Sequence, residues 1–378
     1  MTKHSILFLF AILSGAHVWA QAATLSAPNI SSNLLLIDRN TNYERPTSSD
    51  SRNGFDFQEA ELQFYADVDP YSRLNLLLTV GPQYTLNTIT GRVDETWTIE
   101  PEEAFVESNV LPAVTFKLGK FKALFGKHNI LHSHAYPLID APIINTALLG
   151  DEGLNDVGGS AATLLPTSWF SEVTLQFFRA GPENAEFVSP SSSNMISLAH
   201  WKNLFDLQDS LTMEFGLSAA EGGNSYNSTT ELTGADLTFK WRPMEGGRFH
   251  SGIFGAEYIN RRVGQNMYRD EVGEGVSIFA GYQFAERWST FARYETLRVE
   301  GTDPAFTSGA MALNQNPLTN DTTLKGTLGL QFSATEFSAF SFNMANVHGA
   351  AQAGRDMDEH RFLMQANFTI GSHPAHSY

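Results

Sequence analysis

The stretch Thr115–Gly159, TFKLGKFKALFGKHNILHSHAYPLIDAPIINTALLGDEGLNDVGG, decides how this 378-residue chain is interpreted. It opens as a strand that ends near Phe121, runs for about thirty-five residues without helix or strand periodicity, and returns to alternation near Asp156. Loops this long in compact folds are usually functional or disordered. Its Leu, Ile, Phe and Pro content argues against disorder. A packed, charged loop among short amphipathic strands therefore predicts a segment that folds into a strand-built pore.

The first residues have the composition of a secretory signal peptide. A basic start is followed by an apolar run from Ile6 to Leu13 and by small residues around Ala22. This pattern predicts cleavage after residue 22 and leaves 23–378 as a single domain. The apolar run is too short to span a bilayer as a helix, and no later run of eighteen apolar residues occurs. We therefore expect an exported protein that is either soluble or a β-barrel.

Composition narrows the class further. Export permits disulfides, yet the chain has no cysteine, so its stability must come from burial or from a closed sheet. A formal net charge of −17 argues against nucleic acid as a partner. The 28 Phe, 11 Tyr and 6 Trp residues suit a core or a lipid-facing belt.

Alternation with a period of two is the dominant pattern after residue 22. In one example, Leu62 and Phe64 share a face, while Glu61 and Gln63 lie on the opposite face. The pattern predicts sixteen strands of about ten residues, the length that crosses a bilayer when tilted. They lie near residues 30–38, 56–68, 72–83, 101–110, 113–121, 156–165, 169–180, 194–204, 210–220, 230–242, 249–263, 273–284, 287–300, 323–334, 337–347 and 359–371.

Turns between these strands alternate in length. Tight turns such as 69–72 and 334–336 alternate with long polar connections such as 84–100 and 301–322. Short turns at one rim and long loops at the other are typical of outer-membrane barrels. A soluble sandwich rarely has sixteen strands whose aromatic face opposes a charged face. We therefore predict an all-β transmembrane antiparallel barrel, whose predicted interfacial residues are Trp169, Trp241 and Trp288.

Three stretches carry a resemblance to a known family. They are Phe105–Asn129, Leu138–Gly159 and Leu164–Gln176, within residues 100–180, about a fifth of the chain. In their order and sequence they resemble proteobacterial outer-membrane proteins of the phosphate-selective-porin-like superfamily. The chain is similar in particular to the branch described as porin-like or zinc-regulated outer-membrane proteins.

The resemblance implies a sixteen-stranded barrel, commonly a homotrimer, surrounded by outer-membrane lipid and lipopolysaccharide in a Gram-negative bacterium. It also implies that a Gly-x-Phe-x-x-x-Phe-Gly strand end, here Gly119, Phe121, Phe125 and Gly126, leads into a segment folded into the lumen. Phosphate selectivity does not carry over. The sequence has no obvious arginine row, and its lumen positions are often acidic, as at Glu61, Asp67, Glu107 and Asp236.

Charged residues cluster in and around the predicted constriction, residues 122–155. In one interpretation, basic residues at a narrow, low-dielectric constriction set ion selectivity. In the other, the lysines pair with acidic residues of the same loop, Asp156 included, and hold it to the wall. We expect Lys117 on the lumen face of its strand and the other lysines in the loop. The predicted constriction residues are Lys117, Lys120, Lys122, Lys127, Asp140, Asp151 and Glu152.

Three histidines, His128, His132 and His134, form a candidate metal site. Imidazoles are common ligands of zinc and copper, and side chains two apart on an extended strand point to the same side. Completing a site with His128 requires the backbone to turn, and Asp140 could add a carboxylate. The alternatives are hydrogen bonding within the pore or packing against Tyr136.

The function expected is passive diffusion of small hydrophilic solutes or ions through an outer-membrane channel, with no cofactor required. Two alternatives stay open: a channel that binds or takes up zinc through the histidines, and a non-conducting structural or adhesive barrel. Catalysis is not expected, because no G-x-S-x-G or H-E-x-x-H motif occurs and Ser133 lies directly between two histidines. No plug domain of an active receptor is expected, since strand-like sequence starts near Asn29.

Overall fold

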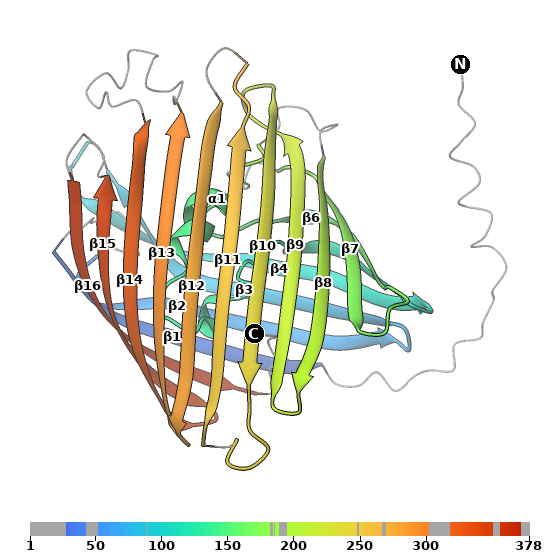
Figure 1. Ribbon diagram of the computed structural model, residues 1–378. Coiled ribbons are helices and arrows are strands. Elements are labelled where there is room, and N and C mark those ends of the chain that lie inside the picture. Colours follow the sequence, from blue (N-terminus) through green and yellow to red (C-terminus); the bar gives the residue numbers. More distant parts are fainter. Residues whose placement is uncertain are drawn as a thin grey trace.

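The protein, seen in a computed structural model, is a closed barrel of antiparallel strands (Figure 1). The structure describes residues 28–42, 52–87, 89–181, 184, 186–188, 195–247, 249–266, 270–301, 318–350 and 356–371, so the predicted signal peptide lies outside it. Each strand pairs with its neighbours in the chain, and β1 closes the ring by pairing with β16. The strands are β1 (Asn29–Thr41), β2 (Gly54–Asp69), β3 (Ser72–Leu86), β4 (Val93–Leu111), β5 (Val114–Lys122), β6 (Asn155–Leu164), β7 (Phe170–Phe178), β8 (Ile196–Gln208), β9 (Leu211–Gly223), β10 (Thr229–Trp241), β11 (Ser251–Val263), β12 (Glu271–Ala285), β13 (Trp288–Gly301), β14 (Leu318–Thr335), β15 (Ser338–Ala350) and β16 (Asp356–Ile370).

The prediction of sixteen strands is confirmed, and each predicted strand overlaps an observed one. The alternating faces are confirmed as well. On β14, Leu328 is 65% exposed on the outer surface, whereas Lys325 and Thr327 on the inner face are 2% and 3% exposed. A closed ring gives every strand two hydrogen-bonded neighbours over at least part of its length. Within the described residues, no helix is long and apolar enough to cross a membrane.

The two rims differ, as expected from the turn pattern. The connections β2–β3, β4–β5, β8–β9, β12–β13 and β14–β15 have two residues each. Two connections at this rim are longer: residues 165–169 separate β6 from β7, and residues 242–250 separate β10 from β11. The three predicted interfacial residues, Trp169, Trp241 and Trp288, all lie at this rim, beside the ends of β7, β10 and β13.

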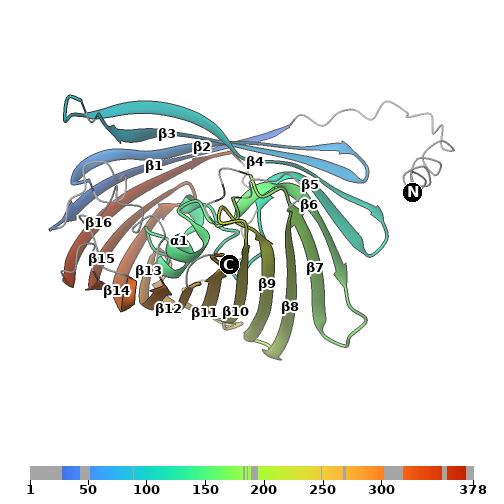
Figure 2. The same cartoon turned by 90° about the horizontal axis from the view of Figure 1, so that it is seen from above.

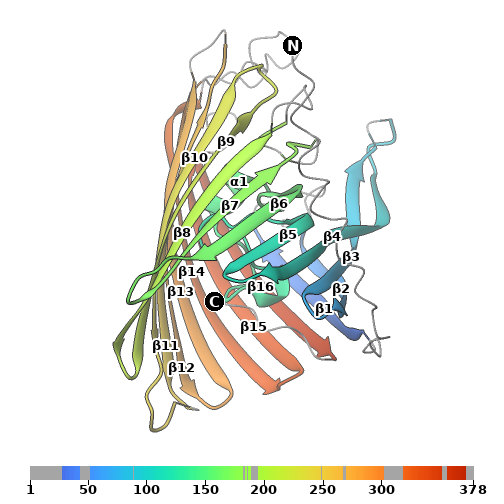
Figure 3. The ribbon, with the colours of Figure 1, turned by 90° about the vertical axis from the view of Figure 1, so that its right-hand side faces the viewer.

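The expected long loop 84–100 is wrong. Strand β3 continues to Leu86 and β4 starts at Val93, and the two stay paired to their ends. Beyond Val80 the hairpin pairs no longer with β2, so it extends past its neighbour (Figure 3). The polar residues Asp94 and Glu95 suggested a loop, but the β-branched and aromatic residues around Trp97 favour a strand.

Residues 123–154, the connection between β5 and β6, form what we call the inner segment. It lies within the ring of strands, where its helix α1 (Ile143–Leu149) contacts β11, β12 and β13 (Figure 2). The expectation that this stretch lacks regular structure is wrong, because it contains α1 and the 3-10 turn η1 (Ser133–Ala135). Both elements are too short to leave a periodic signal. Pro142 precedes α1, and Gly150 ends it with a φ of 95°.

An apolar cluster binds the inner segment to one side of the barrel. Phe125, Ile144 and Leu148 of the segment are fully buried against inward side chains of β7 to β11. Those wall residues are Phe178, Ile196, Leu198, Ala220, Leu232 and Ile259. Full burial of each large apolar side chain contributes about 1.5–3 kcal/mol. The inner face of the barrel is therefore not polar throughout: this side is a packed core.

Glycines of the wall leave the space that the inner segment fills. A Cβ at Gly275 would come within 2.5 Å of Ile144, and one at Gly329 within 2.5 Å of Leu138. A Cβ at Gly234 would lie 3.0 Å from Phe125. These three wall glycines lie on β10, β12 and β14. Their missing side chains leave the space that apolar side chains of the inner segment occupy.

Steric constraints explain why both terminal positions of the Gly-x-Phe-x-x-x-Phe-Gly pattern are glycines. Gly119 has a φ of +137°, and a Cβ there would overlap the backbone of Ala104 and Phe105 on β4. Gly126 has a φ of +63°, and a Cβ there would overlap the carboxylate of Glu257. Both positions lie in the backbone region that side chains rarely adopt. The pattern thus marks the place where the chain leaves the wall and turns inward.

Replacing Gly119 by alanine should impair folding. The strained φ and the overlap with β4 together should cost about 1–3 kcal/mol or more. The folded fraction of refolded Gly119→Ala is measured by the gel mobility of unheated samples. Gly326→Ala is the matched control, because a Cβ at Gly326 meets nothing within 4 Å. Equal folded fractions for the two variants would show that the close approach at Gly119 does not matter.

Candidate functional site: the ion-paired inner segment

Four glutamates on β2 and β4 form what we call the acidic wall, opposite the 3-10 turn of the inner segment. They are Glu59, Glu61, Glu102 and Glu103. Each contacts the turn. His132 Nδ1 lies 3.0 Å from Glu102 and its Nε2 lies 3.3 Å from Glu103. His134 Nδ1 lies 2.6 Å from Glu61, and the Ser133 hydroxyl donates to Glu59.

A β-bulge explains why two consecutive glutamates reach the same imidazole. On β4 the register shifts, so that Leu77 faces Glu103 while Leu78 faces Pro101. Glu102 is thus the extra residue. Pro101 has no N–H to donate to the ladder, and prolines in strands are confined to such positions. Bulges re-aim side chains, and this one turns both carboxylates inward.

The acidic wall is compensated by basic groups of the chain. Lys122 Nζ lies 2.9 Å from Glu102 and also donates to the carbonyl of Leu131 at 3.0 Å. Burial alone would lower the pKa of His132, but Glu102 and Glu103 outweigh this effect and raise its pKa to about 10. His132 is therefore protonated at neutral pH. The turn is held to the acidic wall by ion pairs.

The opposite side of the inner segment meets a row of inward basic residues. Asp140 bridges two of them: its Oδ1 accepts from Arg293 at 2.7 Å and its Oδ2 from Lys325 at 2.6 Å. Burial would raise the pKa of Asp140, but Lys325 and Arg293 hold it well below its usual range. We call the row the basic wall. It consists of Arg261, Arg293, Lys325, Arg361 and Arg39, on β11, β13, β14, β16 and β1.

The basic wall corrects the expectation that the chain has no arginine row. Arg261, Arg293 and Lys325 follow one another at intervals of 32 residues, the length of one strand-turn-strand-loop unit here. That interval was the available sequence signal. Each residue of the row has an acidic partner, such as Glu186 for Arg261 at 2.6 Å and Glu359 for Arg361 at 2.6 Å. The row is therefore largely neutralised.

The structure separates the predicted constriction lysines. Lys117 lies on the inner face, as expected, with Nζ 4.3 Å from the Phe105 ring centre and 4.0 Å from Glu107. Lys120 and Lys122 belong to β5 and not to the loop. Lys120 shares the strand face of Leu118, which is 68% exposed on the outer surface.

The alternative that the lysines pair within their own loop is wrong for the three that reach the interior, among them Lys117, which faces Glu107 on β4. Lys127 Nζ lies 2.6 Å from Glu214 on β9, and Lys122 pairs with Glu102. Asp156 instead contacts Arg179 at 3.0 Å. Asp151 and Glu152 are exposed residues that follow α1, and they border a small cavity together with Lys122 and Ala141.

The three histidines are not gathered at one point. The rings of His132 and His134 are stacked at 6.0 Å, whereas His128 packs against Tyr136 with ring centres 4.5 Å apart. In the part of the chain that the structure describes, no three His, Asp or Glu side chains are placed to hold a metal ion. The packing of His128 on Tyr136 matches one of the alternatives considered for the histidines.

Comparison with known proteins places the fold. No protein-family model matches the chain. A protein of Aquifex aeolicus (strain VF5), described as uncharacterized, is 24% identical over 363 residues and is matched over 71% of its length. Among solved structures, OprB of Pseudomonas putida has a TM-score of 0.58 at 11% identity, covering 91% of this chain and 94% of OprB.

Two further structures agree. The anion-selective porin from Comamonas acidovorans has a TM-score of 0.57 at 10% identity, covering 91% of this chain and 99% of that porin. The outer membrane channel DcaP of Acinetobacter baumannii has a TM-score of 0.55 at 10% identity, covering 91% and 97%. The chain therefore has the porin-type barrel fold. The phosphate-selective-porin-like branch stays a prediction.

The raised pKa of His132 predicts a loss of stability in base. Because its pKa in the fold, about 10, lies above the ordinary 6.5, the ion pairs stabilise fully below about pH 6.5 and are lost as pH rises through 10. The melting temperature of wild type should exceed that of His132→Gln at pH 7 and approach it by pH 11. A difference that stays constant over this range would contradict the ion pairs. An exposed control, His250→Gln, should show no such convergence.

Proposed function

We propose that the protein is an outer-membrane channel for passive diffusion of small hydrophilic solutes or ions, and that the inner segment is its constriction. The observation that carries the proposal is the inner segment itself, tied to an acidic wall on one side and a basic wall on the other. The porin-type fold supports it. No catalytic step is part of the proposal.

The arrangement of charge supports a selective passage. Opposite charges on facing walls of a narrow, low-dielectric space create a field across the path of a solute. Such fields orient dipolar solutes and sort ions at a constriction. Salt bridges from Asp140 to the basic wall and from His132 to the acidic wall hold the segment between the two charged surfaces. The proposed surroundings are lipid and lipopolysaccharide, and the proposed assembly is a homotrimer.

A second candidate is a non-conducting structural barrel. The observation in its favour is the apolar packing inside the ring, where the inner segment contributes to a cluster with β7 to β11. A smaller cluster of Ile37, Ile139 and Leu363 joins the segment to β1 and β16. Single-channel recording in planar bilayers separates the candidates, because the structural barrel gives no current steps.

Removing the inner segment should raise conductance. A variant in which residues 127–152 are replaced by a short Gly-Ser linker keeps all sixteen strands and loses the body that occupies the lumen. We expect single-channel conductance at least several-fold above wild type. Gel mobility of unheated samples establishes that the barrel has formed. Equal conductance in the two proteins would mean that the segment is not the constriction, and a silent wild type with a conducting variant would favour the structural candidate.

Neutralising Asp140 should shift selectivity towards anions. Asp140→Asn leaves Arg293 and Lys325 with less negative charge nearby, so the local potential becomes more positive. The reversal potential in a potassium chloride gradient should move in the anion-selective direction. The matched control is Asp270→Asn at the rim, since Asp270 pairs with the exposed Arg262. If the reversal potential shifted equally in both variants, the change in selectivity would not arise from the charge of Asp140 in the lumen, and the prediction would be wrong.

The histidine spacing carries a separate prediction about zinc. If His132 and His134 bind zinc, micromolar zinc should reduce the wild-type current, and replacing both by alanine should abolish the effect. Unchanged wild-type current in zinc would dismiss the zinc-channel alternative while leaving the passive channel in place.

A further inference from the structure

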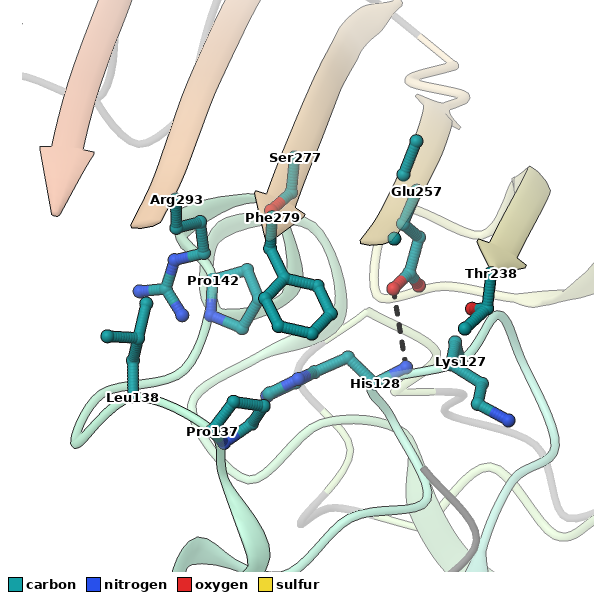
Figure 4. A pocket seen from close by; sticks show the side chains of 12 residues that line it. Lys127, His128, Pro137, Leu138, Pro142, Thr238, Glu257, Ser277, Phe279 and Arg293 are labelled. Carbon is teal, nitrogen blue, oxygen red and sulfur yellow. Dashed lines mark hydrogen bonds between the residues drawn. The ribbon is translucent and has the colours of Figure 1, made fainter. Parts of the chain in front are cut away.

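His128 of the inner segment is buried without hydrogen bonds for its ring. It is 4% exposed, and neither Nδ1 nor Nε2 has a partner among the described residues. Only its backbone is tied down, since the His128 N–H donates to Glu257 at 3.3 Å (Figure 4). A neutral imidazole has one hydrogen-bond donor and one acceptor. Burying either of them without a hydrogen-bond partner costs about 1–3 kcal/mol of folding free energy.

Two cavities lie beside this ring. The larger has a volume of about 30 Å³, and the smaller, about 10 Å³, lies on the side of α1. A buried water molecule needs about 10–15 Å³ of such cavity volume, so the two cavities together have room for about three water molecules. Figure 4 shows His128 between Pro137 and Phe279, with the Glu257 carboxylate nearby. The polar lining of the larger cavity is Lys127, His128, Thr238, Glu257, Ser277 and Arg293.

Another unpartnered polar atom borders the same space. Glu257 Oε1 is buried without a partner at the larger cavity. Asn145 of α1, 4% exposed, lies at the smaller cavity, where its amide reaches the Glu257 carboxylate. Together with the two ring nitrogens of His128, Glu257 Oε1 makes three buried polar atoms without a partner among the described residues. In native proteins nearly all buried polar atoms have a hydrogen-bond partner. The unpartnered atoms around this space therefore indicate that a molecule with hydrogen-bonding groups occupies it.

The cationic groups around the larger cavity already have anionic partners, because Lys127 pairs with Glu214 and Arg293 pairs with Asp140. The cavity therefore does not require an ion as its guest. Burial, and next the charges of Arg293 and Lys122, hold the pKa of His128 well below its usual value, so the imidazole is neutral. Its two nitrogens therefore offer one hydrogen-bond donor and one acceptor.

We propose that the cavities beside His128 are a binding site for small uncharged molecules that both donate and accept hydrogen bonds. Water is the smallest such guest, and small amides are the largest that the volume suits. The apolar side formed by Pro137, Pro142 and Phe279 fits the carbon skeleton of an amide. The proposal goes beyond the channel function and does not depend on conduction.

The first test is a crystal structure of the wild-type protein, grown with and without acetamide. Discrete peaks within hydrogen-bonding distance of the His128 ring and Glu257 Oε1 would support water as the guest. Planar density in the acetamide crystals alone would support a small-amide site. An empty cavity in both crystals would overturn the proposal.

The second test is thermal unfolding in detergent, where the sign of the change is informative. If a guest forms hydrogen bonds to the His128 ring, the His128→Phe variant loses those bonds. Its melting temperature should then fall by about 2–4 °C relative to wild type. His128→Gln keeps a donor and an acceptor and should lose less. In an unoccupied cavity, His128→Phe would instead remove unsatisfied polar atoms and fill space, so a rise in melting temperature would overturn the proposal.

Acetamide provides the matched comparison in the same assay. If it is a guest, it should raise the melting temperature of wild type relative to His128→Phe. The control His250→Phe, at an exposed position, should respond as wild type does. No difference among the three, together with ordered water in the crystal, would identify water as the guest. All readouts use the folded protein without a bilayer, so failure of the channel proposal would leave them unaffected.

Discussion

Burial of apolar side chains between the inner segment and the wall is the interaction on which the interior depends. Phe125, Ile144 and Leu148 are fully buried against β7 to β11, and this contact fixes where the segment starts and ends. The ion pairs of His132 and Asp140 lie between these anchors. Charged groups inside a barrel are stabilising only when they are held in good geometry with their partners, and the apolar anchor provides that constraint.

The strands could be predicted from sequence because their signal is local. A period of two requires no knowledge of partners, and it located all sixteen, including the alternation of Lys325 and Leu328. It failed at Val93–Glu100, where acidic residues masked a strand that is held by β3 alone beyond Val80. Helix α1 was missed because seven residues are too few for a helical period.

The pairings of the candidate site could not be predicted, because each joins residues far apart in sequence. Pairing within its own loop was one of two alternatives for Lys122, but Glu102 reaches it through a bulge whose presence depends on register. Asp140 was recognised as a constriction residue, yet its partners Arg293 and Lys325 lie on strands more than 150 residues away. Only the 32-residue interval of the basic wall was readable in advance, and it acquires meaning once the strand order is known.

The wall glycines make the barrel wall and its inner segment dependent on each other, so that one cannot be exchanged without the other. Gly234, Gly275 and Gly329 lie on three separate strands, and each leaves room for a different side chain of the segment. A segment grafted into another barrel would meet Cβ atoms where these glycines stand here. Exchange between relatives would therefore have to carry wall and segment together, and the spacing of small residues on distant strands records which segment a barrel was shaped to hold.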